Sequence, residues 1–401
     1  MIKTIEHKNI IESLQNIVGK ENLLTDIEDR YVYAFDAFAT DKKPVLPDYV
    51  VLPSNTEQVS KIMELAFEHS IPVTARGAAT NMAGCCIPVE GGIVIHTSRM
   101  NEIIDIDAQN LTCKVQPGVV VGNLQEAVEK IGLFYPPDPS NLKVSTIGGS
   151  IALSSSGPRT FKYGGTKDYV IDLEVVLSDG KVIRTGASTV KNVTGYNLTQ
   201  LFIGSEGTLG IVTEIQLKLI PKPQASKIML VYFDNIDDAA NAVNGIINAR
   251  LTPSVLDMMD QSTMLAVEKF YPSGLLTDMG ASLFIEVDGN KNLIGEEIEN
   301  IGNICSSFSA RSLKIAQNEK EEEEIWTARR ASFSAVAKLA PNVVAEDAVV
   351  PRGKMPEMIK EIKKICQKYN VHACIMGHIG DGLDKFFQFQ VLILCHLYSF
   401  C

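Results

Sequence analysis

A glycine-rich stretch, residues 136–212, places the strongest constraint on how this chain can fold. Segment 137–210 holds 11 of the chain's 29 glycines in 74 of its 401 residues, about twice an even share. Glycine permits positive φ angles and lets a backbone come close to another group. Such positions, set between strand-like segments, indicate backbone amides wrapped around a large anionic ligand. A loop-rich β domain with ordinary turns is the alternative that spacing alone leaves open.

Composition narrows the class of protein. The hydrophobic fraction of 45% and the charged fraction of 21% are those of an ordinary globular protein, long enough for two or three domains. A net charge of −11 argues against a nucleic-acid backbone as the main partner. The eight cysteines show no paired metal spacing, which fits a reducing compartment. With no signal-peptide pattern and no apolar run long enough to span a bilayer, a cytoplasmic location is expected.

The first half of the chain predicts a helical arm followed by a mixed domain. Residues 1–45 form the arm, with apolar residues at roughly helical spacing: Ile10, Ile11, Leu14, Ile17 and Val18. A strand at 49–53, a helix with a capping box from Ser54 to Glu57, and a strand at 71–75 make a βαβ unit, which implies a parallel pair.

A loop of small residues follows this unit at 76–84. Backbone N–H groups of such a loop can cradle phosphate, although the loop matches neither the Walker pattern nor GxGxxG. Further elements of this domain are strands at 92–97, 103–107 and 111–116, a helix at 122–131, a hairpin over 170–185 and a long strand at 210–220. The segment Pro221-Lys222-Pro223 marks the boundary, so the domain spans 46–222.

Residues 223–383 alternate strands and helices with few glycines, which indicates an α+β domain of ferredoxin-like type. The acidic run at 319–324 opens a helix. We expect its side chains to be exposed to solvent and to stabilise the N-terminus of that helix. A strand at 343–350, an amphipathic helix at 354–369 and a strand at 371–376 lead to Gly377-His378-Ile379-Gly380-Asp381-Gly382.

The tail, residues 384–401, departs from this pattern. It has no Gly, Pro or Glu, and five of its 18 residues are aromatic, against 7% for the whole chain. We expect a segment translated out of the original frame or a chimeric end. A short hydrophobic anchor or partner helix is the alternative.

In these motifs the sequence resembles the FAD-linked oxidases with the PCMH-type FAD-binding fold, and within them the group of the glycolate oxidase FAD subunit and the flavin-dependent D-lactate dehydrogenases. The resemblance covers roughly residues 5–382. It is carried by the following motifs: Pro136-Pro137-Asp138-Pro139, Ser145-Thr146-Ile147-Gly148-Gly149, Gly157-Pro158-Arg159, Lys162-Tyr163-Gly164, Val190-Lys191-Asn192-Val193, Gly195-Tyr196-Asn197-Leu198 and Gly204-Ser205-Glu206-Gly207-Thr208-Leu209-Gly210-Ile211. It implies an α+β architecture: a two-subdomain FAD-binding domain at 46–222 and a ferredoxin-like cap at 223–383 that ends early.

The resemblance also implies which residues hold FAD. The loop after the 71–75 strand would follow the pyrophosphate, the 137–149 segment would line pyrophosphate and flavin, and Ile211-Val212 would meet the adenine end. The implied set is Arg76, Gly77, Ala78, Ala79, Thr80, Asn81, Pro137, Asp138, Pro139, Thr146, Gly148, Gly149, Ser155, Gly157, Glu206, Gly210, Ile211 and Val212. Ala79 stands where the family often has a second glycine. No histidine lies between 74 and 90, so FAD is expected to be non-covalent.

For catalysis the resemblance implies Arg329 as the group that holds a substrate carboxylate, with a bidentate guanidinium as the physical reason. It implies His378 as a proton acceptor or metal ligand. Lys385 stands where the family has a second histidine, and the family's later glutamate is missing, so a tight divalent metal is not expected.

The expected activity is the oxidation of a 2-hydroxy acid of the D-lactate or glycolate type by hydride transfer to flavin. Electrons would leave to another protein or a quinone, since no NAD fingerprint is present. A catalytically impaired flavin-binding protein remains the alternative, because the residues implied beyond Gly382 are absent.

Overall fold

The computed structural model describes residues 2–38, 43–189, 191–340, 343–348, 350–380 and 389–394. The chain forms two compact units. The first comprises Met1–Ser156 and Gly165–Lys222, and the second comprises Gly157–Gly164 and Pro223–Cys401. Within the described residues no helix is both long and apolar enough to cross a membrane.

The N-terminal arm is helical, and it also adds a strand to the first sheet. Its elements are α1 (Ile2–Val18), η1 (Lys20–Asn22), β1 (Leu23–Leu24), α2 (Ile27–Tyr31) and η2 (Val32–Ala34). Ile10, Leu14 and Val18 of α1 are buried in one cluster with α3 residues such as Ile62. β1 pairs antiparallel with β2, so the arm is part of the first unit's framework.

The first sheet has four strands in the order β1-β2-β4-β3. Its other elements are β2 (Tyr49–Val51), α3 (Thr56–Glu68), β3 (Val73–Arg76) and β4 (Ile93–His96). β2 and β3 run parallel, as the βαβ pattern predicts, but they are not neighbours, because β4 lies between them and pairs with both. The predicted capping box is wrong: Asn55, with extended backbone angles, caps α3 and accepts a hydrogen bond from the Gln58 N–H.

A second sheet of the first unit has the order β5-β6-β10-β8-β9 and is antiparallel. Its strands are β5 (Ile103–Asp107), β6 (Thr112–Val115), β8 (Val170–Val176), β9 (Val182–Arg184) and β10 (Ile211–Lys218). The predicted hairpin of β8 and β9 is confirmed, with Gly180 at positive φ in its turn. The remaining elements are η3 (Thr97–Arg99), α4 (Val121–Glu129), β7 (Leu133–Phe134), α5 (Ile147–Ala152), η4 (Thr166–Asp168), α7 (Leu198–Phe202) and β11 (Ile220–Pro221).

The second unit is built on a seven-stranded sheet with the order β15-β12-β14-β13-β17-β18-β16. Its strands are β12 (Ala225–Phe233), β13 (Val255–Asp260), β14 (Ala281–Gly289), β15 (Ala310–Ile315), β16 (Val344–Ala348), β17 (His372–Gly377) and β18 (Phe389–Leu394). The first four strands of this unit, β12 to β15, stand in the order fourth, first, third, second, which is the ferredoxin-like arrangement that the sequence predicts.

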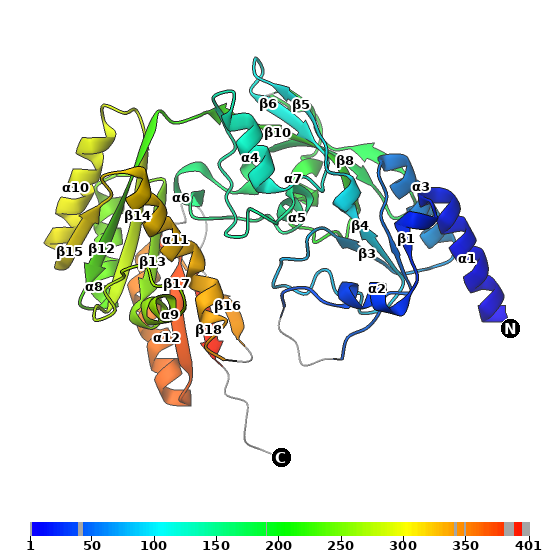
Figure 1. Ribbon diagram of the computed structural model, residues 1–401. Coiled ribbons are helices and arrows are strands. Elements are labelled where there is room, and N and C mark those ends of the chain that lie inside the picture. The colour runs from blue at the N-terminus through cyan, green and yellow to red at the C-terminus, as the bar shows by residue number, and fades with distance from the viewer. Residues whose placement is uncertain are drawn as a thin grey trace. The chain divides into compact units, whose positions relative to one another are not determined.

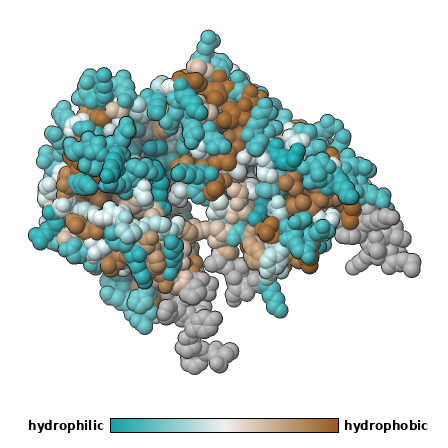
Figure 2. All heavy atoms as spheres, in the orientation of Figure 1, coloured by the Kyte–Doolittle hydropathy of each residue, from teal (hydrophilic) through white to brown (hydrophobic). Residues whose placement is uncertain are grey.

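Helices cover both faces of this sheet (Figure 1). They are α8 (Ile236–Asn248), α9 (Gln261–Phe270), α10 (Ile294–Ser307), α11 (Glu319–Val336) and α12 (Met355–Tyr369), with η5 (Arg352–Lys354) before the last. Met229 and Val231 of β12 pack towards α8, α10 and α12, whereas Ile228 and Leu230 pack towards α9 and α11. This is why β12 is a nearly continuous apolar run. The outer surface of these helices is mainly hydrophilic on the face shown in Figure 2.

A short segment from the glycine-rich stretch also belongs to the second unit. It contains α6 (Thr160–Tyr163), and Phe161 is buried in the core that β13 shares with α8 and α10. We call residues 157–164 the strap. The chain therefore passes between the units at 156/157, 164/165 and 222/223.

The described part of the atypical tail is a strand. β18 pairs antiparallel with both β16 and β17. The alternative prediction of a hydrophobic helix is therefore wrong for residues 389–394, whose backbone hydrogen bonds are made to neighbouring strands. The rest of the predicted tail lies outside the described residues.

Candidate functional site

The small-residue loop after β3 lies against the start of α5, within the first unit. A Cβ on Gly77 would lie 2.5 Å from Thr146 Oγ1 and 3.9 Å from the Cα of Gly149, so only glycine fits at position 77. Thr146 caps α5 by accepting a hydrogen bond from the Gly149 N–H at 3.2 Å. Gly148 is required by packing, because a Cβ there would lie 2.6 Å from the Pro117 side chain. The structure thus brings together three of the predicted cofactor residues: Gly77, Thr146 and Gly149.

The backbone of this loop offers hydrogen-bond donors that the protein itself does not use. The N–H groups of residues 78–82, which include the predicted Ala78, Ala79, Thr80 and Asn81, donate no hydrogen bond to any other described residue. Ala79 has a φ of 53°, in the left-handed region that favours glycine. Consecutive backbone donors of this kind fit the oxygens of a diphosphate.

Buried hydroxyl groups near α5 also lack partners. The Oγ atoms of Ser145 and Ser150 are buried and have no hydrogen-bond partner among the described residues. A buried polar group left unpaired costs about 1–3 kcal/mol, so a ligand that accepts from such groups would offset the cost. These donors, together with those of the loop, suit a dinucleotide rich in phosphate and ring acceptors, and the residues present fit FAD.

Other predicted cofactor residues hold the loops in place. The Arg76 guanidinium donates to the Phe35 carbonyl at 2.7 Å and to the Val32 carbonyl at 3.2 Å, so it ties β3 to η2. Asn81 Oδ1 accepts from the N–H groups of Ala83 and Cys85. These side chains therefore shape the loop, which leaves its backbone for a ligand.

Glu206 links a second glycine-rich turn to the same loop. It has a φ of 56°, its N–H donates to the Ala152 carbonyl, and its Oε2 accepts from the Cys85 thiol at 3.1 Å. Burial and this hydrogen bond raise the pKa of Cys85 to about 12, so the thiol stays protonated and acts as a donor.

The remaining predicted positions lie on other elements. Gly210 packs against β8, where a Cβ would lie 2.6 Å from Val175, and Ile211 and Val212 begin β10. Pro137 and Pro139 flank the buried Asp138. Ser155 accepts from Thr166, and Gly157 starts the strap. The sequence missed Gln125 of α4, which fixes this segment by donating to the carbonyls of Tyr135 and Pro137.

In the second unit, one buried carboxylate joins the two predicted catalytic residues. Asp257 Oδ2 accepts from Arg329 Nε at 2.6 Å, and Asp257 Oδ1 lies 2.7 Å from His378 Nδ1. Asp257 lies on β13, Arg329 on α11, and His378 directly after β17. The side chain of Asp257 is fully buried, that of Arg329 is 9% exposed and that of His378 is 20% exposed.

The alternation of the sheet explains why these residues meet. Cys374 and Met376 of β17 face α9 and α11, and His378 is two residues further along the same parity. On β13, Met259 faces the same side, as does Asp257. The sequence missed Asp257, although a lone aspartate within the apolar run Val255–Met259 is a recognisable signal.

The electrostatics of the three residues favour an ionised carboxylate. Burial by itself would raise the pKa of Asp257, but the charges and hydrogen bonds of Arg329 and His378 outweigh it and hold the pKa below its usual value. Ser332 completes the arrangement: its Oγ accepts from Arg329 Nη1 at 3.1 Å and donates to the Arg329 carbonyl at 2.8 Å.

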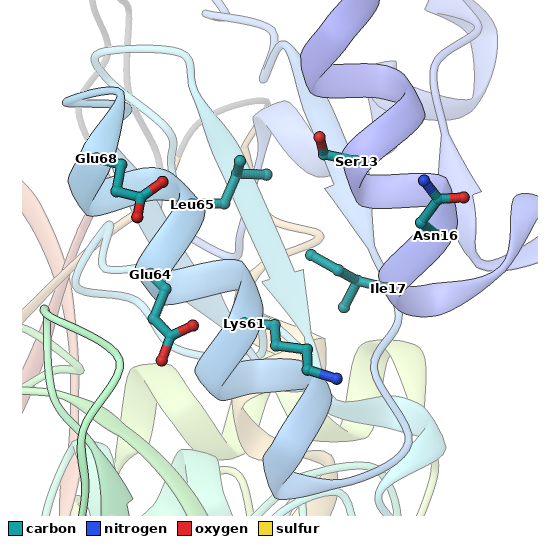
Figure 3. Close-up of a pocket in the computed structure, with 7 residues that line it drawn as sticks. All are labelled: Ser13, Asn16, Ile17, Lys61, Glu64, Leu65 and Glu68. Atoms are coloured by element: carbon teal, nitrogen blue, oxygen red, sulfur yellow. The ribbon is translucent and has the colours of Figure 1, made fainter.

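Neither a metal-binding group nor the pocket that lies between two helices of the first unit gives a further candidate site among the described residues. Among the described residues, no three His, Cys, Asp or Glu side chains are grouped so that they could hold a metal ion, and metal binding through His378 stays a prediction. A groove of about 330 Å³ lies between α1 and α3 (Figure 3). Ordinary surface residues line it, such as Asn16, Lys61 and Glu64, and none of the predicted site residues does.

Comparison with known proteins gives these sites a context. The family described as FAD binding domain matches residues 47–186, and that described as FAD linked oxidases, C-terminal domain, matches residues 222–383. Glycolate oxidase subunit GlcD of Bacillus subtilis is 46% identical over 375 residues, which are 94% of this chain and 79% of the relative. D-lactate dehydrogenase of Anaerostipes hadrus is 34% identical, over 93% of this chain and 79% of the relative.

A solved structure supports the fold. p-Cresol methylhydroxylase with substrate bound has a TM-score of 0.78 at 16% identity, over 97% of this chain and 83% of that one. The architecture is therefore that of the PCMH-type FAD-binding fold with an α+β cap. The chain belongs to the FAD-linked oxidase family and is an FAD-dependent oxidoreductase.

Proposed function

We propose that this protein oxidises a small 2-hydroxy acid of the D-lactate or glycolate type to the corresponding 2-oxo acid. The observation that carries the proposal is the buried Asp257 carboxylate, which binds a cation and an imidazole side by side. A 2-hydroxy acid needs both kinds of group, one for its carboxylate and one for its hydroxyl. The relatives named glycolate oxidase subunit and D-lactate dehydrogenase support this substrate class.

FAD is held without a covalent bond by residues of the first domain, 46–222, while 223–383 supplies the substrate groups. The donors of the loop at 78–82 and the buried hydroxyls beside α5 support this assignment. The reaction removes a hydride from the α-carbon and a proton from the hydroxyl, and bound FAD supplies the acceptor for the hydride.

His378 takes the hydroxyl proton. Imidazole is the side chain best suited to accept a proton near neutral pH, and the partial exposure of His378 leaves it accessible to a small molecule. The α-carbon hydrogen and the hydroxyl proton leave in the same oxidation, so a base at the hydroxyl is required for the carbonyl to form.

Arg329 holds the substrate carboxylate. Its Nε is already bound to Asp257 and its Nη1 to Ser332, whereas Nη2 has no hydrogen-bond partner among the described residues. A two-bonded clamp must therefore use the Nη1 and Nη2 edge of the guanidinium. Because Asp257 neutralises part of the positive charge of Arg329, the site prefers a small monocarboxylate to a dicarboxylate.

Electrons leave to another protein or to a quinone. The sequence carries no dinucleotide fingerprint that would place NAD as the acceptor. One relative is named as a subunit of glycolate oxidase, which supports a protein partner for this chain as well.

The test is anaerobic reduction of the purified holoprotein. D-lactate or glycolate should bleach the flavin absorbance band, whereas the L-isomer of lactate and acetate should not. A His378→Gln variant should bind FAD normally but bleach about 10²-fold more slowly or worse, as expected for loss of a general base. A stable flavin band that no 2-hydroxy acid bleaches would instead support an impaired flavin-binding protein.

A further inference from the structure

We propose that Asp257 is the positioning residue of this site: it fixes the tautomer of His378 and the plane of Arg329 without itself touching the substrate. The inference rests on the proposed function, because it gives a role to a residue that acts through the two groups assigned to the substrate.

The location of Asp257 is rigid. It lies in the middle of β13, opposite Phe284 of β14, in a strand whose residues are all buried. Its carboxylate is completely shielded from solvent, and each of its oxygens has its own partner, Arg329 Nε on Oδ2 and His378 Nδ1 on Oδ1. A carboxylate held in this way can rotate only if it breaks both contacts.

The contact with His378 determines which ring nitrogen carries the proton. An ionised carboxylate has no proton to donate, so the short contact requires that Nδ1 carry hydrogen. In the neutral imidazole, the lone pair is then on Nε2. Hydrogen bonds to the other ring nitrogen orient and select reactive histidines in the same way at metal and catalytic sites.

The contact with Arg329 determines how the guanidinium is presented. Nε is tied to Asp257, and Nη1 is tied to Ser332, whose hydroxyl is in turn anchored to the backbone of α11. Two fixed points on one planar group leave no freedom of rotation about the last side-chain bonds. The free N–H groups of Nη1 and Nη2 therefore keep one direction, and Asp257 sets the geometry of the proton acceptor and of the carboxylate holder together.

A purely structural ion pair would make different predictions. Removing such a pair would change the free energy of unfolding. It would change neither the tautomer of His378 nor the rates of substrate binding and flavin reduction. The strand offers a matched control in Asp260, which is also buried on β13 but caps α9 through Thr263 and has no hydrogen bond to His378 or Arg329 among the described residues.

The first experiment measures the tautomer directly by NMR on holoprotein labelled with ¹⁵N-histidine, with His378→Gln used for assignment. We expect the Nδ1–H form for His378 in the wild type and in Asp260→Asn. In Asp257→Asn the amide can present either its oxygen or its NH₂ group, so the Nδ1–H form should lose its dominance. An unchanged His378 signal in Asp257→Asn overturns the inference, and this result does not depend on turnover.

The second experiment measures flavin reduction at saturating D-lactate or glycolate. Asp257→Asn should lower the reduction rate about 10²-fold, the scale of losing a partner that orients a reactive histidine, and should also weaken binding of the substrate. Asp257→Glu should recover part of the rate, and Asp260→Asn should keep it. In a His378→Gln background, adding Asp257→Asn should lower the reduction rate by less than about 3-fold, because the imidazole that Asp257 positions is already absent.

The outcomes separate the two proposals. If no 2-hydroxy acid reduces the wild-type flavin, the proposed function fails, while the NMR result still decides whether Asp257 positions His378. If the wild type is reduced and Asp257→Asn reacts at the wild-type rate with only a lower unfolding midpoint, the function stands and the positioning role is refuted.

Discussion

At the scale of single residues, Ala79 is in a conformation that its side chain disfavours. Its φ of 53° is in the left-handed region, where an L-residue with a Cβ carries about 1–2 kcal/mol of strain. Ala79→Gly should raise the free energy of unfolding of the apoprotein by about 0.5–1 kcal/mol, since part of the relief is offset by the greater freedom of glycine in the unfolded chain. Urea denaturation measures the change. Ala78→Gly, whose φ is not positive, should stabilise nothing, and an equal gain at both positions would contradict the strain argument.

Asp257 should also make stability depend on pH. Its folded pKa is lowered, so it contributes stability that is fully present above the unfolded value of about 3.9 and is lost as pH falls through the folded value. Asp257→Asn should cost about 3–5 kcal/mol at pH 7, because Arg329 is left as a buried, unpaired cation. The difference between wild type and variant should shrink as the pH of chemical denaturation falls below 4. A difference that stays constant with pH would mean that the carboxylate is not ionised in the folded protein.

Some of these residues are recognisable from sequence motifs, and others are not. His378 and Arg329 were identifiable because they occur in motifs of a known family, and the structure brings them together. Asp257 could not be found by motif, since its role follows from a side-chain contact between segments 72 and 121 residues apart in the chain. The Asn55 cap was missed by one residue because Ser54 and Asn55 are both good caps, and only the backbone angles decide between them.

At the scale of elements, the strap is attached to the second unit by a compact set of polar contacts. Lys162 Nζ lies 2.6 Å from both the carbonyl and the Oδ1 of Asp288, and the Tyr163 hydroxyl donates to Asp288 Oδ2 at 2.8 Å. Arg159 lies 3.5 Å from Glu286, which is itself held by Ser254. Asp288 and Glu286 lie on the same face of β14, two residues apart.

Removal of Asp288 should release the strap. Asp288→Ala removes the carboxylate that accepts from Lys162 and Tyr163 and leaves Lys162 only the backbone carbonyl, at a cost of about 2 kcal/mol once the partial exposure of Lys162 is considered. Arg159 and Lys162 are trypsin sites within the strap, so the variant should be cleaved between residues 157 and 164 under conditions where the wild type is intact. Mass spectrometry of the fragments gives the position. Asp278→Ala, at an exposed carboxylate, is the control and should leave the strap resistant.

Most elements were predictable because their signals are local. Amphipathic or apolar periodicity located β5, β6, β10, β17 and α12 within a few residues. Strand neighbours were less predictable: a βαβ pattern does not reveal that β4 is inserted between β2 and β3, because pairing depends on contacts distant in sequence. The assignment of α6 to the second unit depends in the same way on Phe161 packing beside Leu256, which no local pattern encodes.

At the scale of the whole molecule, the chain passes between the two units three times, and we expect these passages to make the stability of one unit depend on the other. The base of the strap is held in the first unit, where the Ser155 carbonyl accepts from both the N–H and the hydroxyl of Thr166. Its tip is held in the second unit by Phe161 and Asp288. When the first unit unfolds, the contacts of Thr166 that close the base of the strap are broken. We expect Phe161 then to be held less firmly in the core of the second unit.

This coupling can be measured, because Trp326, the chain's single tryptophan, lies on α11 of the second unit, whereas the predicted FAD donors lie in the first. A ligand at 100 times its Kd stabilises the state that binds it by about 2.7 kcal/mol. FAD should therefore raise the thermal midpoint seen by Trp326 fluorescence as much as the midpoint seen by flavin release. Riboflavin lacks the diphosphate that the loop at 78–82 would bind, so at the same concentration it should shift neither thermal midpoint.

In Asp288→Ala the midpoint seen by Trp326 fluorescence should respond less to FAD than the midpoint seen by flavin release. If FAD moves the flavin transition alone in the wild type, the units unfold independently and the strap does not couple them.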